Sequence, residues 1–406
     1  MSQPVPCGIR DVDLNAPLPA LVLEGDEQSL LAVFWQDDVP VGRRLFLRAE
    51  LPVSAAAMPA LAAAACAPAV LLLDTPAPGN ADLEVSVVVC TRDRPEPLRR
   101  CMAALAKCDP APDEIIVIDN AANPGGLEDV LAAFPAVRLV HEPRAGLSFA
   151  RNNGLTKAKG AVVAYTDDDV AVTPNWISAI RAAFSDPKVG SVTGPVLPAR
   201  LRSDAEFAFE IDIGGLAPSL LPKVFDEGFL ASGPLKAPHV WEIGAGANFA
   251  IRKEVLADIG PFDERLGAGA AGCSEDSEFW YRLLGAGWLC VYRPEVVVHH
   301  DHRGTSADFG DQMRAYMRGH VAALCIQFSE SRRIGNLSRI ILGLPKYYVG
   351  WGVIRVAAWL GFGWLEPWGR TARATRFAQM RGAVEGVAYF WRHRAQQKFS
   401  KTETDE

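Results

Sequence analysis

The clearest pattern in the chain is an alternation of short apolar runs and longer amphipathic segments between residues 85 and 167. Four near-continuous apolar runs predict buried strands, at 85–91, 114–119, 137–142 and 161–167. Three segments between them have apolar residues at helical spacing and predict helices, at 95–108, 127–134 and 147–158. Strands that are apolar throughout and alternate with helices are typical of a parallel sheet covered on both faces. The pattern therefore predicts an α/β fold.

Residues 1–73 have a different pattern and predict a small separate unit. Two apolar runs flank a polar turn in LLAVFWQDDVPVGRRLFLRAEL (30–51), as in a β-hairpin. An uncharged, alanine-rich run at 55–73 contains two prolines, which favours a buried helix followed by a short strand or linker over a membrane span. The stretch at 74–83 is rich in Pro, Gly and Asp and is typical of a linker.

The region 306–406 predicts helices with an unusual charge. Residues 331–401 hold 13 Lys and Arg side chains against two acids, although the whole chain has a formal net charge of −7. The apolar run at 347–364 is long enough to span a bilayer, but Arg355 at its centre disfavours spanning. Basic residues interleaved with Trp and Tyr are typical of a helix that lies on a membrane surface. Packing of this basic region on the acidic remainder of the chain is the alternative.

Composition limits the partners and the compartment. The net negative charge argues against nucleic acid as the main partner. The eight cysteines are scattered and form no CxxC pair, which argues against a zinc site and a dense disulfide framework. The N-terminus shows no basic region followed by an apolar one, so we expect no secretory signal. We therefore expect a cytoplasmic protein, with the inner face of the plasma membrane as the place of any peripheral attachment.

Polar residues follow several of the predicted strands. Thr91 and Arg92 follow the first strand, Asp119 ends the second, and Asp167–Asp169 end the fourth. In a parallel sheet these ends meet at one edge, where ligands bind. Capping a turn would need one carboxylate, whereas three adjacent ones repel each other, and a hard divalent cation would remove that repulsion. Mg²⁺ or Mn²⁺ takes carboxylate oxygens together with those of phosphate, so we expect a metal–diphosphate site here.

The motifs around these residues resemble those of one family. Six segments occur in the order and spacing of family 2 glycosyltransferases with the GT-A fold: VSVVVCTRDRPEPL, IIVIDN, GLSFARNNGL, YTDDDVAVTPNW, GAGANFAIRKEVLADIGPFDE and CSEDSEFWYRLLGAGW. The resemblance covers about residues 84–303. It implies a GT-A nucleotide-binding domain at 84–305 with a mostly parallel central sheet. It also implies transfer of a sugar from a nucleotide-diphosphate donor to a hydroxyl acceptor, with inversion at the anomeric carbon.

The resemblance also assigns roles at the strand ends. It places the donor nucleotide against Thr91, Arg92, Asp119, Arg151, Asp167 and Asp168. Within this set Asp119 would contact the base, which favours UDP- or dTDP-sugars, and Asp168 would face the ribose. Asp169 would bind the metal that bridges the two phosphates. For Arg151 an internal salt bridge is an equal alternative to a place in the nucleotide pocket.

The acceptor hydroxyl must lose a proton as it attacks, and a nearby carboxylate can take it. SEDSEF (274–279) follows a Gly-rich loop, and the resemblance places the base at Asp276 with Glu275 beside it. The alternative is that these acids only satisfy the positive end of a helix dipole. We expect Glu278 to be structural, paired with Arg282 one helical turn later.

Two further segments contain residues that could contact a sugar, a phosphate or a metal ion. GAGAN (244–248) lacks the third small residue of a dinucleotide fingerprint, and Asn248, like Trp241, is either a sugar contact or a packing residue. VVVHHDHRGT (296–305) predicts a strand that ends in a histidine cluster. Alternation places His300 and His302 on one face and His299 on the other. We favour His300 as a metal ligand or phosphate contact, with a hydrogen-bonded strand end as the alternative.

Two other functions compete with glycosyl transfer. A sugar nucleotidyltransferase would have a Gly-rich loop after the first strand, where this chain has CTRDRPEP. A non-catalytic sugar-nucleotide-binding protein would be favoured by loss of the Glu275–Asp276 pair or of Asp169, and all three acids are intact. The favoured interpretation is thus an enzyme of envelope polysaccharide or glycolipid assembly, with a glycan or a lipid-linked acceptor.

Overall fold

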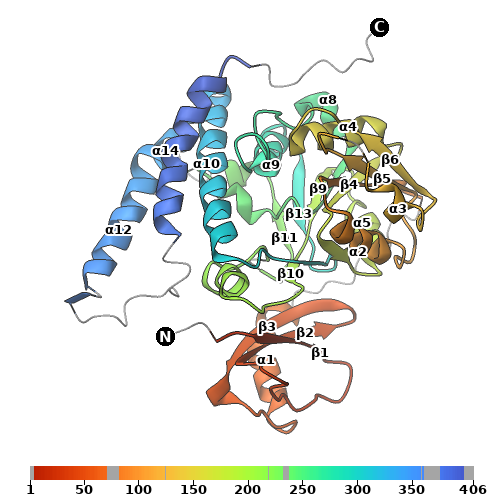
Figure 1. Ribbon diagram of the computed structural model, residues 1–406, viewed down its shortest axis with the longest axis vertical. Coiled ribbons are helices and arrows are strands. Elements are labelled where there is room, and N and C mark those ends of the chain that lie inside the picture. The colour runs from red at the N-terminus through yellow and green to blue at the C-terminus, as the bar shows by residue number, and fades with distance from the viewer. Residues whose placement is uncertain are drawn as a thin grey trace.

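The computed structural model describes residues 4–70, 82–123, 125–217, 219–231, 237–357, 359–360 and 375–396. Figure 1 shows three parts: a small sheet near the N-terminus, a central α/β unit, and a group of long helices beside that unit. Most of the predicted linker and the residues 361–374 and 397–406 lie outside the described residues.

The N-terminal unit is a three-stranded sheet with one helix. Its elements are β1 (Cys7–Asp13), β2 (Ser29–Gln36), β3 (Val39–Leu47), the short turn η1 (Arg48–Glu50) and α1 (Met58–Val70). The antiparallel β2–β3 pair confirms the predicted hairpin, whereas the parallel β1–β2 pair was not predicted. Three residues of α1, namely Met58, Ala62 and Cys66, bury their side chains in the core beneath this sheet, which confirms a buried helix in the alanine-rich run.

The central unit is built on an eight-stranded sheet in the order β11-β13-β9-β12-β7-β4-β5-β6. The four neighbouring strands that were predicted are parallel to one another: β4 (Val85–Thr91), β5 (Glu114–Asp119), β6 (Val137–His141) and β7 (Val162–Asp167). The other four were not predicted: β9 (Val189–Thr193), β11 (Lys223–Phe225), β12 (Asn248–Arg252) and β13 (Leu289–Tyr292). Because β11 and β12 run antiparallel to their neighbours, the sheet is mixed but mostly parallel.

Helices cover both faces of this sheet, as predicted. Side chains of α2 (Pro95–Leu105), α3 (Glu128–Leu131) and α5 (Trp176–Ala183) share one core with Val87 and Val89 of β4. On the opposite face, α4 (Leu147–Lys157) and α9 (Glu275–Gly285) pack around Val88. Short helices and single helical turns complete the unit: α6 (Asp204–Phe207), η2 (Ala208–Asp212), α7 (Glu227–Leu230), η3 (Val240–Glu242), η4 (Lys253–Val255) and α8 (Leu256–Ile259).

A second, three-stranded sheet lies at the end of β7. It has the order β10-β14-β8, with β8 (Val170–Val172), β10 (Val196–Pro198) and β14 (Val298–His300). Strand β8 begins one residue after the three aspartates, and its Val170 pairs with His300 of β14. This pairing brings the histidine cluster next to the aspartates, although the two are 131 residues apart in the chain.

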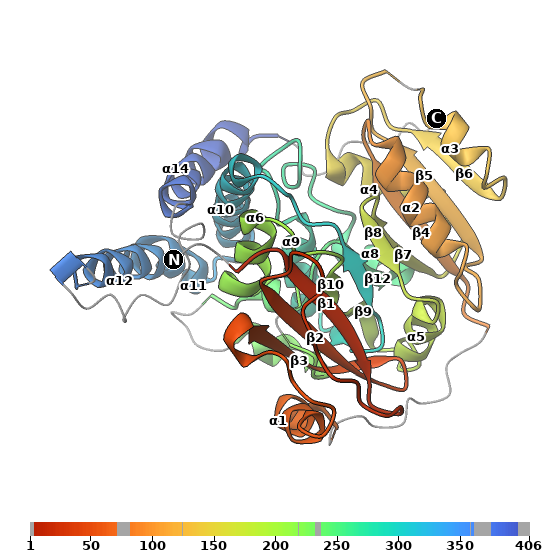
Figure 2. The same ribbon diagram turned by 60° about the horizontal axis from the view of Figure 1, so that its bottom comes forward.

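The C-terminal region is helical, as predicted. It contains α10 (Ser306–Ser331), α11 (Ile334–Ser338), η5 (Arg339–Gly343), α12 (Leu344–Ala357) and α14 (Arg376–His393). Gly382 and Gly386 of α14 lie so close to the α10 backbone that a Cβ atom would come within 2.2 and 2.5 Å of its carbonyl oxygens. In both ribbon views α12 extends away from the central unit (Figures 1 and 2). Among the residues described, no helix is both long and apolar enough to cross a membrane.

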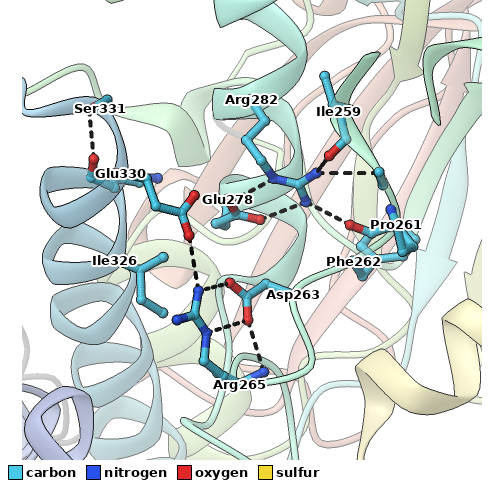
Figure 3. Close-up of polar contacts among 12 residues, drawn as sticks. Ile259, Pro261, Phe262, Asp263, Arg265, Glu278, Arg282, Ile326, Glu330 and Ser331 are labelled. Carbon is cyan, nitrogen blue, oxygen red and sulfur yellow. Dashed lines mark hydrogen bonds and ion pairs between the residues drawn. The ribbon is translucent and has the colours of Figure 1, made fainter. Parts of the chain in front are cut away.

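An ion pair connects α10 to the loop that precedes α9 (Figure 3). The guanidinium of Arg265 lies 2.6 Å from Asp263 and 3.1 Å from Glu330 of α10. Within α9, Arg282 Nε donates to Glu278 Oε1 at 2.7 Å, which confirms the predicted pair one helical turn apart. The same guanidinium bonds backbone carbonyls of the 259–261 segment, so both arginines hold the path of the chain towards the start of α9.

Candidate active site

The polar ends of the parallel strands meet at one edge, as predicted. Thr91 lies opposite Asp119 in the β4–β5 ladder, and Cys90 lies opposite Asp167 in the β4–β7 ladder. Thr91 Oγ1 donates a hydrogen bond to Asp168 Oδ2 at 2.6 Å. Strand β4 lies between β5 and β7. Its last residue, Thr91, is therefore next to Asp119 on one side and bonded to Asp168 on the other.

The three aspartates are neutralised by side chains of the chain itself. Arg94 donates to Asp168 Oδ1 at 2.5 Å and to Asp169 Oδ2 at 2.9 Å. His300 Nε2 lies 3.4 Å from the other oxygen of Asp169, and Arg151 Nη2 lies 3.7 Å from Asp167 Oδ1. A divalent cation is therefore not the only group that can reduce the repulsion among these acids, because two arginines and a histidine already lie against them.

The environment gives the three carboxyl groups different proton affinities. Burial raises the pKa of Asp168 to about 6, against the hydrogen bond from Thr91 and the charge of Arg94. Burial also raises the pKa of Asp167. At Asp169 burial acts in the same direction, but the hydrogen bond and charge of His300 outweigh it and lower the pKa. Asp169 is thus the acid of this group that is most firmly held as a carboxylate.

Arg94, which we did not select, takes the position that we expected for Arg92. The Arg92 side chain is 53% exposed, and its nearest charged partner is the adjacent Asp93 at 3.9 Å. Asp93 has a positive φ of 56°, which turns the chain so that Arg94 faces the end of β7. At this strand end Arg94, rather than Arg92, contacts the aspartates, and the contact of Arg92 with the nucleotide stays a prediction.

Asp119 is buried at the end of β5. Its Oδ1 accepts a hydrogen bond from the Ala121 amide at 3.0 Å, and its Oδ2 lies 4.0 Å from His141 Nδ1. That Nδ1 atom is buried and has no hydrogen-bond partner among the described residues. This distance is too long for a hydrogen bond, so His141 Nδ1 keeps an unused hydrogen-bonding capacity beside Asp119.

Arg151 connects the strand ends to the start of α9. Its side chain is only 2% exposed, and Nη1 donates to Glu275 Oε1 at 2.6 Å. Its Nη2 donates to the Gly246 carbonyl at 2.9 Å, on the loop before β12. The ion pair with Glu275 matches the alternative of an internal salt bridge, and the position beside Asp167 keeps Arg151 at the edge of the site.

Asp276 lies in the first turn of α9, directly after the Gly-rich loop. The loop turns through Gly267, Gly269 and Gly272, all with positive φ. Asp276 Oδ1 accepts a hydrogen bond from the Ser277 amide at 2.6 Å. A Cβ atom at Gly246 would lie 3.0 Å from Asp276 Oδ2 and 2.8 Å from Arg151 Nη2. Gly246, which we did not single out, therefore gives both side chains the space to meet beside its backbone.

The two predicted sugar contacts have different environments. Asn248 is completely buried; it accepts a hydrogen bond from Trp176 Nε1 at 2.9 Å and donates to two backbone carbonyls. The structure thus favours the packing alternative for Asn248. Trp241 is 41% exposed, stacks on His239 and lies under the guanidinium of Arg339 at 4.5 Å. An exposed indole face with polar neighbours remains able to contact a ligand.

The histidines lie as strand alternation predicts. His300 Nδ1 and His302 Nδ1 are 3.0 Å apart, on the side of the aspartates. His299 points the other way and stacks on Trp35 of the N-terminal unit. His300 therefore lies between Asp169 and His302.

The residues present suit a divalent cation only in part. Within the described ranges, no group of three His, Cys, Asp or Glu side chains could hold a metal ion. Asp169 and His300 supply one carboxylate and one imidazole, at facing ends of β7 and β14. A cation that takes one or two protein ligands and completes its shell with phosphate oxygens and water fits this arrangement, as Mg²⁺ commonly does.

Comparison with known proteins identifies the domain. Residues 86–260 match the model of Glycosyl transferase family 2. The succinoglycan biosynthesis protein ExoM of Rhizobium meliloti is 27% identical over 226 residues, 54% of this chain and 67% of that protein. An N-acetylglucosaminyl-diphospho-decaprenol L-rhamnosyltransferase of Mycobacterium tuberculosis is 26% identical over 267 residues, 57% of this chain and 81% of that protein.

A solved structure shows the same fold. The mannosyltransferase PcManGT of Pyrobaculum calidifontis, in complex with GDP-Man and Mn²⁺, superposes with a TM-score of 0.51 at 19% sequence identity. The superposition covers 78% of this chain and 91% of that one. These comparisons confirm the resemblance drawn from the six motifs: residues 86–260 match the family 2 glycosyltransferase model, and the central unit has the GT-A fold.

Proposed function

We propose that the protein is an inverting, metal-assisted glycosyltransferase that moves a sugar from a nucleoside diphosphate donor to a hydroxyl group. The observation that carries this proposal is the arrangement around Arg151. This buried arginine reaches Asp167, at the end of β7, and Glu275, at the start of α9. The acids proposed to bind the donor and the acid proposed as base are thereby held at one edge of the sheet.

The reaction is a single displacement. The acceptor oxygen attacks the anomeric carbon while the bond from that carbon to the phosphate oxygen breaks, and the configuration inverts. The acceptor proton passes to the Asp276 carboxylate, whose Oδ1 is oriented by the Ser277 amide. A divalent cation held by Asp169 and His300 would stabilise the negative charge of the leaving diphosphate. Glu275, bonded to Arg151, positions the first turn of α9.

The donor nucleotide lies, in this proposal, across the ends of β4, β5 and β7. Asp119 Oδ2 and the unbonded His141 Nδ1 offer an acceptor and a ring nitrogen for the base. An acceptor suits the N3–H group of uracil or thymine, so UDP- or dTDP-sugars are favoured. Each oxygen of Asp168 already accepts one hydrogen bond, from Thr91 or from Arg94, so a ribose hydroxyl would use a remaining lone pair or replace Arg94.

For the acceptor we propose a glycan or a lipid-linked saccharide of the cell envelope. One relative is named for succinoglycan biosynthesis and another for transfer to a diphospho-decaprenol carrier. Trp241, half exposed near the start of β12, is the proposed contact for an acceptor sugar.

A lipid-linked acceptor agrees with attachment to a membrane surface, which we propose for the C-terminal helices. On α12, Val349, Val353 and Val356 are 67, 64 and 58% exposed and recur at the spacing of one helix face. Lys346 and Arg355 on the same helix supply basic charge. An apolar face with adjacent cations suits the inner surface of an anionic membrane.

Calorimetry with UDP and MnCl₂ tests the assignment of the site. We expect the wild-type chain to bind UDP in a Mn²⁺-dependent manner. Asp169→Asn should abolish this dependence, whereas Asp276→Asn should bind nearly normally and fail to transfer sugar. Normal turnover in either variant would refute the role assigned to that residue. Thermal stabilisation by a panel of nucleotide sugars, with and without Mn²⁺, identifies the donor.

Sedimentation with vesicles tests the membrane proposal separately. The full-length protein should co-sediment with vesicles that contain phosphatidylglycerol and less with neutral ones. The double substitution Val349→Glu and Val353→Glu should abolish binding. Val224→Glu, at an equally exposed valine of β11, is the matched control and should bind as wild type. Equal binding by both variants would exclude α12 as the attachment surface.

A further inference from the structure

A line of polar contacts runs from the N-terminal unit to the aspartates. Arg43 Nη1 of β3 lies 2.7 Å from Glu210 Oε1, and Glu210 Oε2 lies 3.1 Å from His302 Nε2. His302 Nδ1 lies 3.0 Å from His300 Nδ1. The other ring nitrogen of His300 lies 3.4 Å from Asp169 Oδ1. Five residues from four separate segments thus form one continuous chain of contacts.

We propose that Arg43 and Glu210 are positioning residues that hold His300, through His302, in one orientation against Asp169. The N-terminal unit is then part of the framework of the active site rather than an independent appendage. That His300 binds a metal ion rests on the proposed function. That Arg43 and Glu210 position His300 does not depend on it.

The central part of this chain of contacts is buried and sterically fixed. The side chains of Glu210 and His302 are 0 and 1% exposed. Glu210 lies in the π-helical turn η2, a type of distortion that is frequent at functional sites. Gly215 has a φ of +62°, and a Cβ atom there would come within 2.2 Å of the Glu210 carboxylate. Phe209 packs its ring edge-on against His302 at 4.8 Å, so neither side chain can readily turn.

Hydrogen-bonding capacity then decides which nitrogens carry protons. An ionised carboxylate only accepts hydrogen bonds, so His302 Nε2 must donate to Glu210. In a neutral imidazole the remaining nitrogen, His302 Nδ1, is an acceptor. His300 therefore donates from its Nδ1, and its Nε2 is the atom directed at Asp169. A hydrogen bond to the distal nitrogen of this kind is how proteins orient an imidazole ligand.

Arg43 contributes the charge that this arrangement needs. A buried carboxylate without a counter-ion is costly. The ion pair with Arg43 supplies that counter-ion to Glu210 from the N-terminal unit. Arg43 therefore helps to keep the Glu210 carboxylate in place as the hydrogen-bond acceptor for His302.

The N-terminal unit also packs directly behind the histidine strand. Val33 of β2 shares a buried cluster with Leu197 and Val297, next to β10 and β14. Trp35 stacks on His299 at a ring distance of 6.2 Å. The unit therefore packs directly on the β14 region through Val33 and Trp35, and Arg43 reaches the histidines indirectly, through Glu210.

Nitrogen NMR of the full-length, metal-free protein labelled with ¹⁵N-histidine tests the proposal directly. The chain has seven histidines, so single His→Gln substitutions assign the signals. We expect His302 to show the Nε2–H tautomer in the wild type. Glu210→Gln and Arg43→Gln should shift the His302 signals away from that tautomer. Arg43→Lys, which keeps the charge, should restore them.

Two substitutions serve as matched controls. Arg10→Gln removes another N-terminal arginine of similar exposure, paired with Glu27 at 2.8 Å. Glu206→Gln removes another buried glutamate one helical turn before Glu210, paired with Arg200 at 3.1 Å. Both should leave the His302 signals unchanged, even where they lower the melting temperature.

Titration with MnCl₂ and UDP provides the second readout. Loss of a residue that orients a ligand typically weakens metal binding about 10–100-fold, and we expect this for Glu210→Gln and Arg43→Gln. Unchanged His302 signals in both variants would overturn the proposal. If the wild type shows the expected tautomer but binds no Mn²⁺ with UDP, the metal assignment fails while the positioning role stands.

Discussion

Arg151 Nη1 donates to Glu275 Oε1 at 2.6 Å, and the two side chains are 2 and 6% exposed. A buried ion pair of this kind is strongly destabilising when only one partner is removed, because the other charge is left without compensation. The same pair joins α4, on which Arg151 lies, to the first turn of α9. Stability and the position of the proposed base are thus coupled through one contact.

The first prediction concerns that coupling. Arg151→Met should lower the free energy of unfolding by about 3–5 kcal/mol, since it leaves Glu275 buried and unpaired. Adding Glu275→Gln should recover a large part of the loss, because the uncompensated charge disappears. Urea denaturation of the two single variants and the double variant measures the coupling. Arg44→Met, which breaks an exposed pair with Glu50, should cost about 0–1 kcal/mol. Additive effects of the two buried substitutions would refute the coupling.

The second prediction concerns Gly246. The Cβ of Gly246→Ala would lie 2.8 Å from Arg151 Nη2 and 3.0 Å from Asp276 Oδ2, so both flexible side-chain ends must shift. We expect a small change in melting temperature and a fall in turnover of about 10–100-fold, because small displacements at a reacting centre are costly. Gly285→Ala, where the nearest atom is a Leu230 methyl at 3.9 Å, is the control and should keep full turnover. Equal activity of the two variants would contradict the position assigned to Asp276.

The first half of the GT-A unit could be predicted from the sequence because its signals are local. Strands β4 to β7 are continuous apolar runs of five to seven residues that pair with parallel neighbours on one side of the sheet. The later strands β8, β10 and β11 have three residues each, too few for a periodic pattern of apolar residues to be recognised. Those strands exist because distant segments pair with them, which periodicity does not reveal.

The site was predicted where it depends on strand ends, and missed where it depends on distant partners. Thr91, Asp119 and the aspartates share one edge because the parallel order requires it. Asn248 is of a residue type that often contacts ligands. Its side-chain amide nevertheless donates both hydrogens to backbone carbonyls that are 53 and 48 residues away in the chain. The link between Arg43 and Glu210 spans 167 residues, and no local pattern indicates it.

The third prediction distinguishes Arg94 from Arg92. Arg94→Met removes the cation bonded to Asp168 and Asp169, so the melting temperature of the metal-free protein should fall. Added MnCl₂ with UDP should then stabilise this variant more than the wild type, because the ion replaces part of the lost positive charge. Differential scanning fluorimetry with and without MnCl₂ measures both effects. Arg92→Met, at a half-exposed residue that lies 3.9 Å from the Asp93 carboxylate, should behave as wild type. Identical shifts in the two variants would refute the role of Arg94.

The fourth prediction concerns pH and the attachment of the C-terminal helices. His320 of α10 accepts a hydrogen bond from Arg339 Nε at 3.2 Å and lies edge-on to Trp241 at 5.0 Å. Burial, together with the charges of Arg339 and His239, lowers the pKa of His320 from 6.5 to about 3. A protonated His320 could no longer accept the Arg339 hydrogen bond.

The sign of the effect follows from the direction of that shift. Because the folded-state pKa is depressed, the contribution of neutral His320 is fully present above pH 6.5 and is lost as the pH falls towards about 3. Between pH 6.5 and about pH 3, each unit of fall in pH lowers the free energy of unfolding by at most about 1.4 kcal/mol through His320. His320→Gln keeps an acceptor without titrating, so its urea midpoint should fall less than that of the wild type between about pH 7 and pH 5. If the urea midpoints of the two proteins fall in parallel with pH, His320 does not cause the pH dependence of stability. A steeper fall in the wild type would assign that dependence to the contact between α10 and η5.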